Sequence, residues 1–248
     1  MALLAGAPSL AVAADDWQAQ VGEALGKTGA TAAGGIYRVG LPRTDLKVTL
    51  DGVELKAGFA LGSWLAFEKM GDSGMVMGDL VLTMDEVSPV MKKLVEGGIE
   101  VTALHNHLLR NQPFTMYMHI LGHGDPVKLA AALHTALGES KTPLAAASTP
   151  AAAPPPIDLD TAAIDQALGA KGTNNGGVYQ FGIPRAEPIK DSGMDVPAAM
   201  GSAKSCLLWP LVLISSTSRH SDCNSRISTL NDSGTPGSMA ASPLTMAS

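Results

Sequence analysis

The sequence predicts an α+β fold in which helices cover an antiparallel sheet, built as a duplicated domain with an incomplete second copy. Apolar residues recur at helical spacing in three segments of the first half, and strand-like runs lie between them. The pair Asp51-Gly52, a favoured hairpin turn, interrupts one of these runs. The pattern of residues 25–43 also returns at 168–185. Hairpins mixed with helices are typical of an antiparallel sheet with helices on its face.

The first elements follow from apolar spacing and from glycines. We expect a helix over 17–25, because its apolar residues share one face and Gly26 then ends it. Strands are expected over three runs, namely 35–39, 47–55 around the Asp51-Gly52 turn, and 75–82.

The next helix has a marked beginning. Thr83 and Glu86 have the spacing of a capping box, and Gly97 follows the last apolar residue of the helix face. Pro89 lies in the early turns, so an alternative start has Ser88 as the cap. Two strands, 99–108 and 114–121, and a helix that is capped by Asp125 and ends at Gly138 complete the first copy.

Composition divides the chain into five parts: 1–14 as a signal-peptide remnant, 15–140 as the complete domain, 141–156 as an Ala/Pro linker, 157–203 as the partial second copy, and 204–248 as a tail. The first part contains Ala11-Val12-Ala13, a cleavage-like pattern without a basic region before it; an apolar unstructured N-terminus is the alternative. The tail is Ser-rich and lacks amphipathic periodicity, so we expect it to be disordered or out of frame.

Charge and hydropathy limit the partners. The net charge is −6 and aromatic residues make up 4% of the chain, so we expect no nucleic-acid binding. No apolar run is long enough for a transmembrane segment. The half-formed second copy would expose Val178, Phe181 and Ile183, so we expect a homo-oligomer or intramolecular pairing of the two copies.

The stretch Leu104-His105-Asn106-His107-Leu108 contains two of the histidines that form the candidate functional site of the chain. Alternate residues of a strand share a face, so His105 and His107 project together. If the following hairpin is centred near Gln112, His105 pairs with His119 and His107 with Tyr117, which brings three imidazoles together. The repeat contains no second copy of this stretch, so the chain has one candidate site.

Three imidazoles with an open position favour zinc, and another divalent transition metal fits as well. The alternative is that His-x-His lies on an ordinary strand surface. Asp79 and Glu86 are the candidate catalytic residues, either as oxygen ligands or as assisting carboxylates. Glu86 also fits the capping box, and Asp79 could hydrogen-bond a turn. His134 is expected to be structural or exposed, and Arg43 to form an ion pair rather than to bind an anion.

Four motifs occur in order in the first copy: Met77-Gly78-Asp79-Leu80-Val81-Leu82, Asp85-Glu86-Val87, Gly98 to Leu108, and Tyr117-Met118-His119. With these motifs the chain resembles the LppY/LpqO family, a bacterial, usually exported domain of unknown function that often occurs as a tandem pair. Two departures are the missing lipobox cysteine and the second copy, which lacks the half with the histidines. The resemblance implies a periplasmic or secreted protein and supplies no activity.

We therefore expect an exported metal-binding domain with His105, His107 and His119 as ligands and a small polar or anionic ligand as partner. The first alternative is a zinc-dependent hydrolase or lyase in which Glu86 or Asp79 assists. The second is a structural envelope module without catalysis.

Overall fold

The computed structural model describes residues 16–144, 156–191 and 193–202 in full, together with the backbone of strands at 204–209, 212–215 and 242–243. The predicted signal-peptide remnant, residues 145–155 of the predicted linker and most of the predicted tail lie outside the described residues. No helix in these described ranges is long and apolar enough to cross a membrane.

The centre of the fold is a six-stranded sheet in the order β1-β2-β5-β6-β9-β7, and all its neighbours are antiparallel. Its strands are β1 (Ala30–Thr31), β2 (Tyr37–Pro42), β5 (Gly62–Met70), β6 (Ser73–Thr83), β9 (Thr115–Gly124) and β7 (Glu100–His105). The predicted α+β class with an antiparallel sheet is confirmed.

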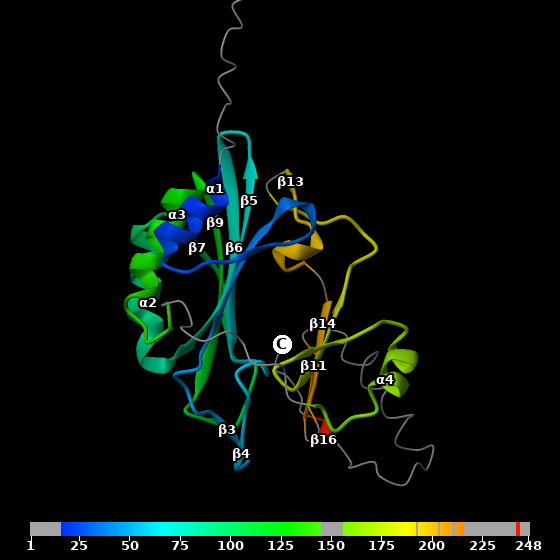
Figure 1. Ribbon diagram of the computed structural model, residues 1–248. Coiled ribbons are helices and arrows are strands. Elements are labelled where there is room, and N and C mark those ends of the chain that lie inside the picture. Colours follow the sequence, from blue (N-terminus) through cyan, green and yellow to red (C-terminus); the bar gives the residue numbers. More distant parts are fainter. Residues whose placement is uncertain are drawn as a thin grey trace, which may run out of the picture.

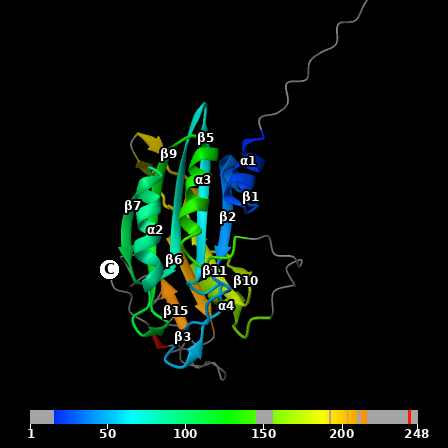
Figure 2. The same ribbon diagram turned by 90° about the vertical axis from the view of Figure 1, so that its left-hand side faces the viewer.

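Three helices cover one face of this sheet (Figures 1 and 2). They are α1 (Trp17–Leu25), α2 (Met84–Glu96) and α3 (Pro126–Leu137). Their apolar faces form one buried cluster with the sheet, and this cluster includes Val21, Val90, Leu133, Leu65, Leu80 and Met118. Burial of this kind stabilises the fold by roughly 25 cal/mol for each Å² of apolar surface removed from water.

The helix ends confirm the capping signals of the sequence. The carboxylate of Asp16 accepts the N–H of Ala19 at the start of α1, and Gly26 ends that helix in the left-handed conformation. Glu86 accepts the N–H of Thr83 at 2.9 Å, so α2 begins at the capping box and not at the alternative cap, Ser88. These bonds satisfy backbone groups that a helix end leaves without an intrahelical partner.

One central strand, β5, was not among the expected elements. Ser63, Leu65, Ala66 and Phe67 are all buried, because β5 lies between β2 and β6 and is covered on both faces. A strand buried on both faces loses the alternation that marks a half-exposed strand. The Asp51-Gly52 turn, by contrast, does join a hairpin, formed by β3 (Thr49–Leu50) and β4 (Val53–Glu54).

The hairpin register predicted for the histidines is wrong by two residues. Ala103 pairs with His119, and His105 pairs with Tyr117. The cause is a longer loop, in which β8 (Asn111–Gln112) pairs with β3 instead of continuing the hairpin. Because the shift is two residues and not one, each side chain keeps its predicted face of the sheet.

Residues 156–202 lie over the other face of the sheet. They contain α4 (Thr161–Leu168), β10 (Thr173–Asn175), β11 (Val178–Ile183), β12 (Lys190–Asp191) and β13 (Met194–Asp195), together with a short 3₁₀ helix, η2 (Ala198–Met200). The order α4, β10, β11 matches α1, β1, β2, while the duplication itself stays a prediction. β11 pairs with β14 (Lys204–Trp209), and β15 (Val212–Ser215) and β16 (Ser242–Pro243) follow in that sheet.

Apolar contacts join this second part to the sheet. Val178 packs in a buried cluster with Phe59 and Tyr117. Val196 and Met200 pack in another cluster that includes residues of β5 and β6. In Figure 1 the second part, drawn in yellow-green to orange, lies on the side of the sheet opposite helices α1, α2 and α3.

Candidate metal centre

The three predicted histidines come from neighbouring parts of the sheet. His119 lies within β9, His105 is the last residue of β7, and His107 lies in the loop just after β7. On β9, Met118 and Ile120 point into the helix-covered core. Because alternate residues of a strand point to opposite faces, His119 and Tyr117 project to the other face, as the sequence predicted.

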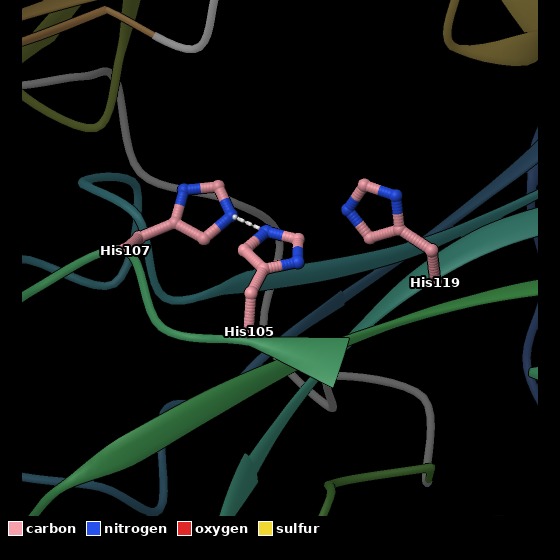
Figure 3. A group of neighbouring side chains, drawn as sticks. All are labelled: His105, His107 and His119. Atoms are coloured by element: carbon pink, nitrogen blue, oxygen red, sulfur yellow. Dashed lines mark hydrogen bonds between the residues drawn. The ribbon is translucent and has the colours of Figure 1, made fainter. Parts of the chain in front are cut away.

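The imidazole rings are close enough to share one ion. Nε2 of His105 lies 2.9 Å from Nε2 of His107, and the donor atoms of all three histidines lie within 4.8 Å of one another. Figure 3 shows the rings side by side, with a nitrogen of His105 and a nitrogen of His119 turned toward each other. Nitrogen ligands about 2.0–2.1 Å from a tetrahedral zinc are about 3.3 Å apart, so donor atoms that lie up to 4.8 Å apart would have to approach by on the order of 1.5 Å to share one ion.

Tyr117 fixes the position of His107. The ring centroids of the two residues are 3.9 Å apart, and the phenol donates a hydrogen bond to the carbonyl of Ala60. Burial raises the pKa of Tyr117 above its usual value, so this phenol remains a neutral donor at physiological pH. Since the tyrosine is packed in the apolar cluster with Phe59, it gives His107 a rigid support although His107 itself lies in a loop.

The three imidazoles favour their neutral form, which is the form that binds metals. Burial, followed by the charges of His105 and His119, lowers the pKa of His107 to about 3. Burial also lowers the pKa of His105 and of His119. A cluster of this kind disfavours protonation and leaves nitrogen lone pairs free for a cation.

Asp79 is a carboxylate that lies beside the histidine cluster. It lies in β6 directly opposite His119 of β9, and its Oδ2 is 3.7 Å from Nε2 of that histidine. Its Oδ1 is buried and has no hydrogen-bond partner among the described residues. Burial raises the pKa of Asp79 to about 7. The residue lies within a strand and not at a turn, so the turn-bonding role considered from the sequence does not apply.

Glu86, the other candidate carboxylate, is engaged elsewhere. It accepts hydrogen bonds from Nη1 and Nη2 of Arg43 at 2.8 and 3.0 Å, and from the N–H groups of Thr83 and Lys141, each at 2.9 Å. Arg43 is fully buried and also bonds Asp45, which confirms the ion pair expected for this arginine. The structure therefore brings Asp79 to the histidines and places Glu86 in a separate buried network.

The remaining described histidines lie outside the cluster. His134 faces the carbonyl of Leu25, with Nδ1 2.8 Å from the oxygen, which agrees with the structural role expected for it. Nε2 of His123, in β9, lies 3.6 Å from Oδ2 of Asp191.

The three histidines line a large cleft between the sheet and the second part. The cleft has a volume of about 1170 Å³ and is lined by residues of both parts, among them Asp79, the three histidines, Trp64 and Arg38. Sequence reasoning missed Arg38 and Trp64. The sequence could have indicated Arg38. Its neighbours in the strand, Tyr37 and Val39, are apolar and face the helices, so the arginine between them must project to the opposite face.

A comparison with known protein families shows which family the chain belongs to. The family described as "Domain of Unknown Function (DUF1259)" matches residues 19–139 and 162–210, which is more than half of the chain. The chain belongs to this family. No curated protein and no solved structure matches it. The match covers most of the first domain, including the stretch with the three histidines, and the start of the second part, and the description of the family names no activity.

Proposed function

We propose that this protein is an exported metal-binding protein, in which His105, His107 and His119 hold a divalent transition metal for contact with a small polar or anionic ligand. One observation supports the proposal: the three imidazoles have donor atoms within 4.8 Å of one another and line a cleft. Three protein ligands leave a coordination position for a small molecule. Zinc is the first choice because imidazole suits it, and copper, nickel, iron and manganese are the alternatives.

The arrangement is better suited to a ligand set than to an ordinary polar surface. The rings face one another, and among the described residues the hydrogen bond of the cluster joins Nε2 of His105 to Nε2 of His107, so these ring nitrogens meet each other and not a carboxylate or a backbone carbonyl. His134, by comparison, faces a backbone carbonyl, as a structural histidine does. The motifs shared with the LppY/LpqO family support export, and we place the protein in the periplasm or outside the cell on that basis.

Metal analysis of the purified full chain tests the proposal. The protein is loaded with zinc, cobalt, nickel or manganese, dialysed, and assayed for bound metal by mass spectrometry. We expect about one ion per chain in the wild type and a loss of bound metal in His105→Ala, His107→Ala and His119→Ala. His123→Ala is the matched control, since this histidine shares strand β9 with His119 and lies outside the cluster. A wild type that retains none of the four metals would favour a purely structural envelope module.

A zinc-dependent hydrolase or lyase is the second candidate, and the free Oδ1 of Asp79 beside the histidines favours it. A zinc ion with three protein ligands activates a bound water at neutral pH. Asp79 is then the assisting carboxylate, because Glu86 is held by Arg43 and by two backbone N–H groups. Turnover by the metal-loaded protein on a panel of esters, peptides and hydroxy-keto acids, abolished in Asp79→Asn, would select this candidate. Bound metal without turnover would select a binding protein.

A further inference from the structure

Arg38 is the cleft residue whose charge the described structure leaves unbalanced. Its Nη1 donates to the carbonyl of Ala199 at 2.6 Å, and its guanidinium carbon lies 4.4 Å from the centre of the Trp64 ring. No carboxylate pairs with it among the described residues. Two other basic residues of the cleft do have acidic partners, since Arg185 pairs with Glu187 and Lys190 pairs with Asp195.

The environment of Arg38 is suited to holding an anion. Burial lowers the pKa of the guanidinium, which nevertheless remains charged at physiological pH. A half-buried charge without a counter-charge is costly, and a carboxylate from a ligand would remove that cost. The carbonyl of Ala199 uses only Nη1, so Nε and Nη2 remain for the two oxygens of one carboxylate, the fork geometry that arginine favours.

Arg38 and the histidines face the same cleft from different strands. Along one line across the sheet, Gly40 of β2 pairs with Trp64, Trp64 with Asp79, and Asp79 with His119. Arg38 lies two residues from Gly40 and therefore on the same face. Neighbouring strands are roughly 4.8 Å apart, so β2 and β9 are separated by on the order of 14 Å. The Arg38 side chain extends over Trp64 of β5, which leaves roughly 10 Å between the guanidinium and the imidazoles.

The surface between these two polar ends is largely apolar. The ring of Trp64 and the side chain of Met77 lie on the sheet side, and Ile189 and Val196 line the cleft from the second part. Two acidic residues also line the cleft, Asp79 beside His119 and Asp191 near His123, and a divalent cation at the histidines would offset the charge of Asp79. The cleft thus has Arg38 at one end, the proposed metal at the other, and mainly apolar side chains between them apart from Asp79.

We propose that the cleft binds a small aliphatic dicarboxylate, with one carboxylate at the open position of the metal and the other at Arg38. This inference rests on the proposed metal site and specifies the class of its ligand. The metal and the arginine together take up most of the roughly 10 Å span through their contact distances, so a spacer of two or three methylene groups fits. The methylene groups pack against Trp64 and Met77.

Calorimetric titration of the zinc-loaded full chain tests the inference. The probes are succinate, glutarate, adipate and suberate, with butyrate as the monocarboxylate and inorganic phosphate as the competing anion. We expect succinate or glutarate to bind most tightly, and butyrate to bind roughly 10- to 100-fold more weakly, because it makes no bond to Arg38. Suberate is too long for the span and should bind more weakly than adipate.

Arg38→Gln is the decisive variant. Glutamine can retain the hydrogen bond to the Ala199 carbonyl, and glutamine is the residue at the matching position of the repeat, Gln180, which also lines the cleft. We expect this variant to bind glutarate as weakly as the wild type binds butyrate, while its affinity for butyrate is unchanged. Arg185→Gln, at a cleft arginine that already has an acidic partner, is the matched control and should bind glutarate like the wild type. Thermal unfolding and metal content are measured on each sample.

The outcomes separate this inference from the metal proposal. Bound zinc together with equal glutarate affinity in wild type and Arg38→Gln overturns the inference and leaves the metal site intact. Bound zinc with Arg38-dependent binding of phosphate but not of dicarboxylates overturns the ligand class. A chain that retains no metal overturns both proposals, and the metal content of the same samples identifies that case.

Discussion

Asp79 and His119 lie directly opposite each other on strands β6 and β9, with Oδ2 of the aspartate 3.7 Å from Nε2 of the histidine. Through this pairing the candidate metal centre lies directly beside β6, a largely buried strand in the middle of the sheet. A carboxylate beside a ligand histidine orients the ring and increases its basicity, or completes the coordination of the ion. Either contribution strengthens metal binding.

Asp79→Asn should therefore weaken zinc binding by roughly 10- to 100-fold, because the amide carries no charge and is a poorer acceptor. Competition with a chromophoric chelator measures this affinity. Asp191→Asn is the control, since that carboxylate also lines the cleft but lies near His123, which is outside the three-histidine cluster. Equal zinc affinity in Asp79→Asn and wild type would show that the aspartate plays no part in the centre.

Arg43→Met should destabilise the fold by about 3–5 kcal/mol, since it leaves the buried carboxylate of Glu86 without its guanidinium partner. Urea denaturation gives the free energy of unfolding. Arg110→Met removes an exposed ion pair with Asp51 and should change stability little. The prediction fails if the two variants are equally stable.

Stability should fall in acid through Glu86. Burial opposes ionisation of this carboxyl, but hydrogen bonds from Arg43, Lys141 and Thr83 outweigh burial and hold its pKa below the usual value of 4.5. A carboxyl with a lowered pKa in the folded state adds stability above its unfolded pKa and loses it as the pH falls through the folded pKa. The free energy of unfolding should decline as the pH falls below the usual value of 4.5 and through the lower pKa of the folded state, and Glu86→Gln should flatten that decline. An unchanged pH profile in Glu86→Gln would contradict this assignment.

Gly201→Ala should loosen the contact between the second part and the sheet. Gly201 has a φ of +102°, and a methyl group on it would overlap the ring of Trp64. We expect a loss of about 1–3 kcal/mol in unfolding free energy and weaker binding of any ligand held at Arg38. Gly98→Ala is a matched control, because Gly98 also has a positive φ of +74° but open space around it. Equal losses in both variants would mean that the Trp64 contact contributes nothing.

Features that depend on neighbouring residues in the chain could be predicted correctly from the sequence. Strand alternation alone predicted that His105 and His119 share the face opposite the core, and this held although their pairing shifted by two residues. The capping box likewise placed the start of α2 correctly, because it depends on residues within one turn.

The remaining features depend on contacts between distant segments. The strand β5 was missed because burial on both faces removes its alternation, and the register was wrong because β8 pairs with β3, about sixty residues earlier. Choosing between Asp79 and Glu86 needed the position of Arg43, since only the packed fold shows which carboxylate the arginine neutralises.

Crystallographic anomalous scattering at the zinc absorption edge, measured on the zinc-loaded full chain, tests the central claim most directly. We predict a single strong peak on the cleft face, about 2.0–2.1 Å from one nitrogen each of His105, His107 and His119. The peak should vanish in crystals of His107→Ala and persist in crystals of His123→Ala. The absence of a peak among the three imidazoles at saturating zinc, or a peak held by other residues, would contradict the account.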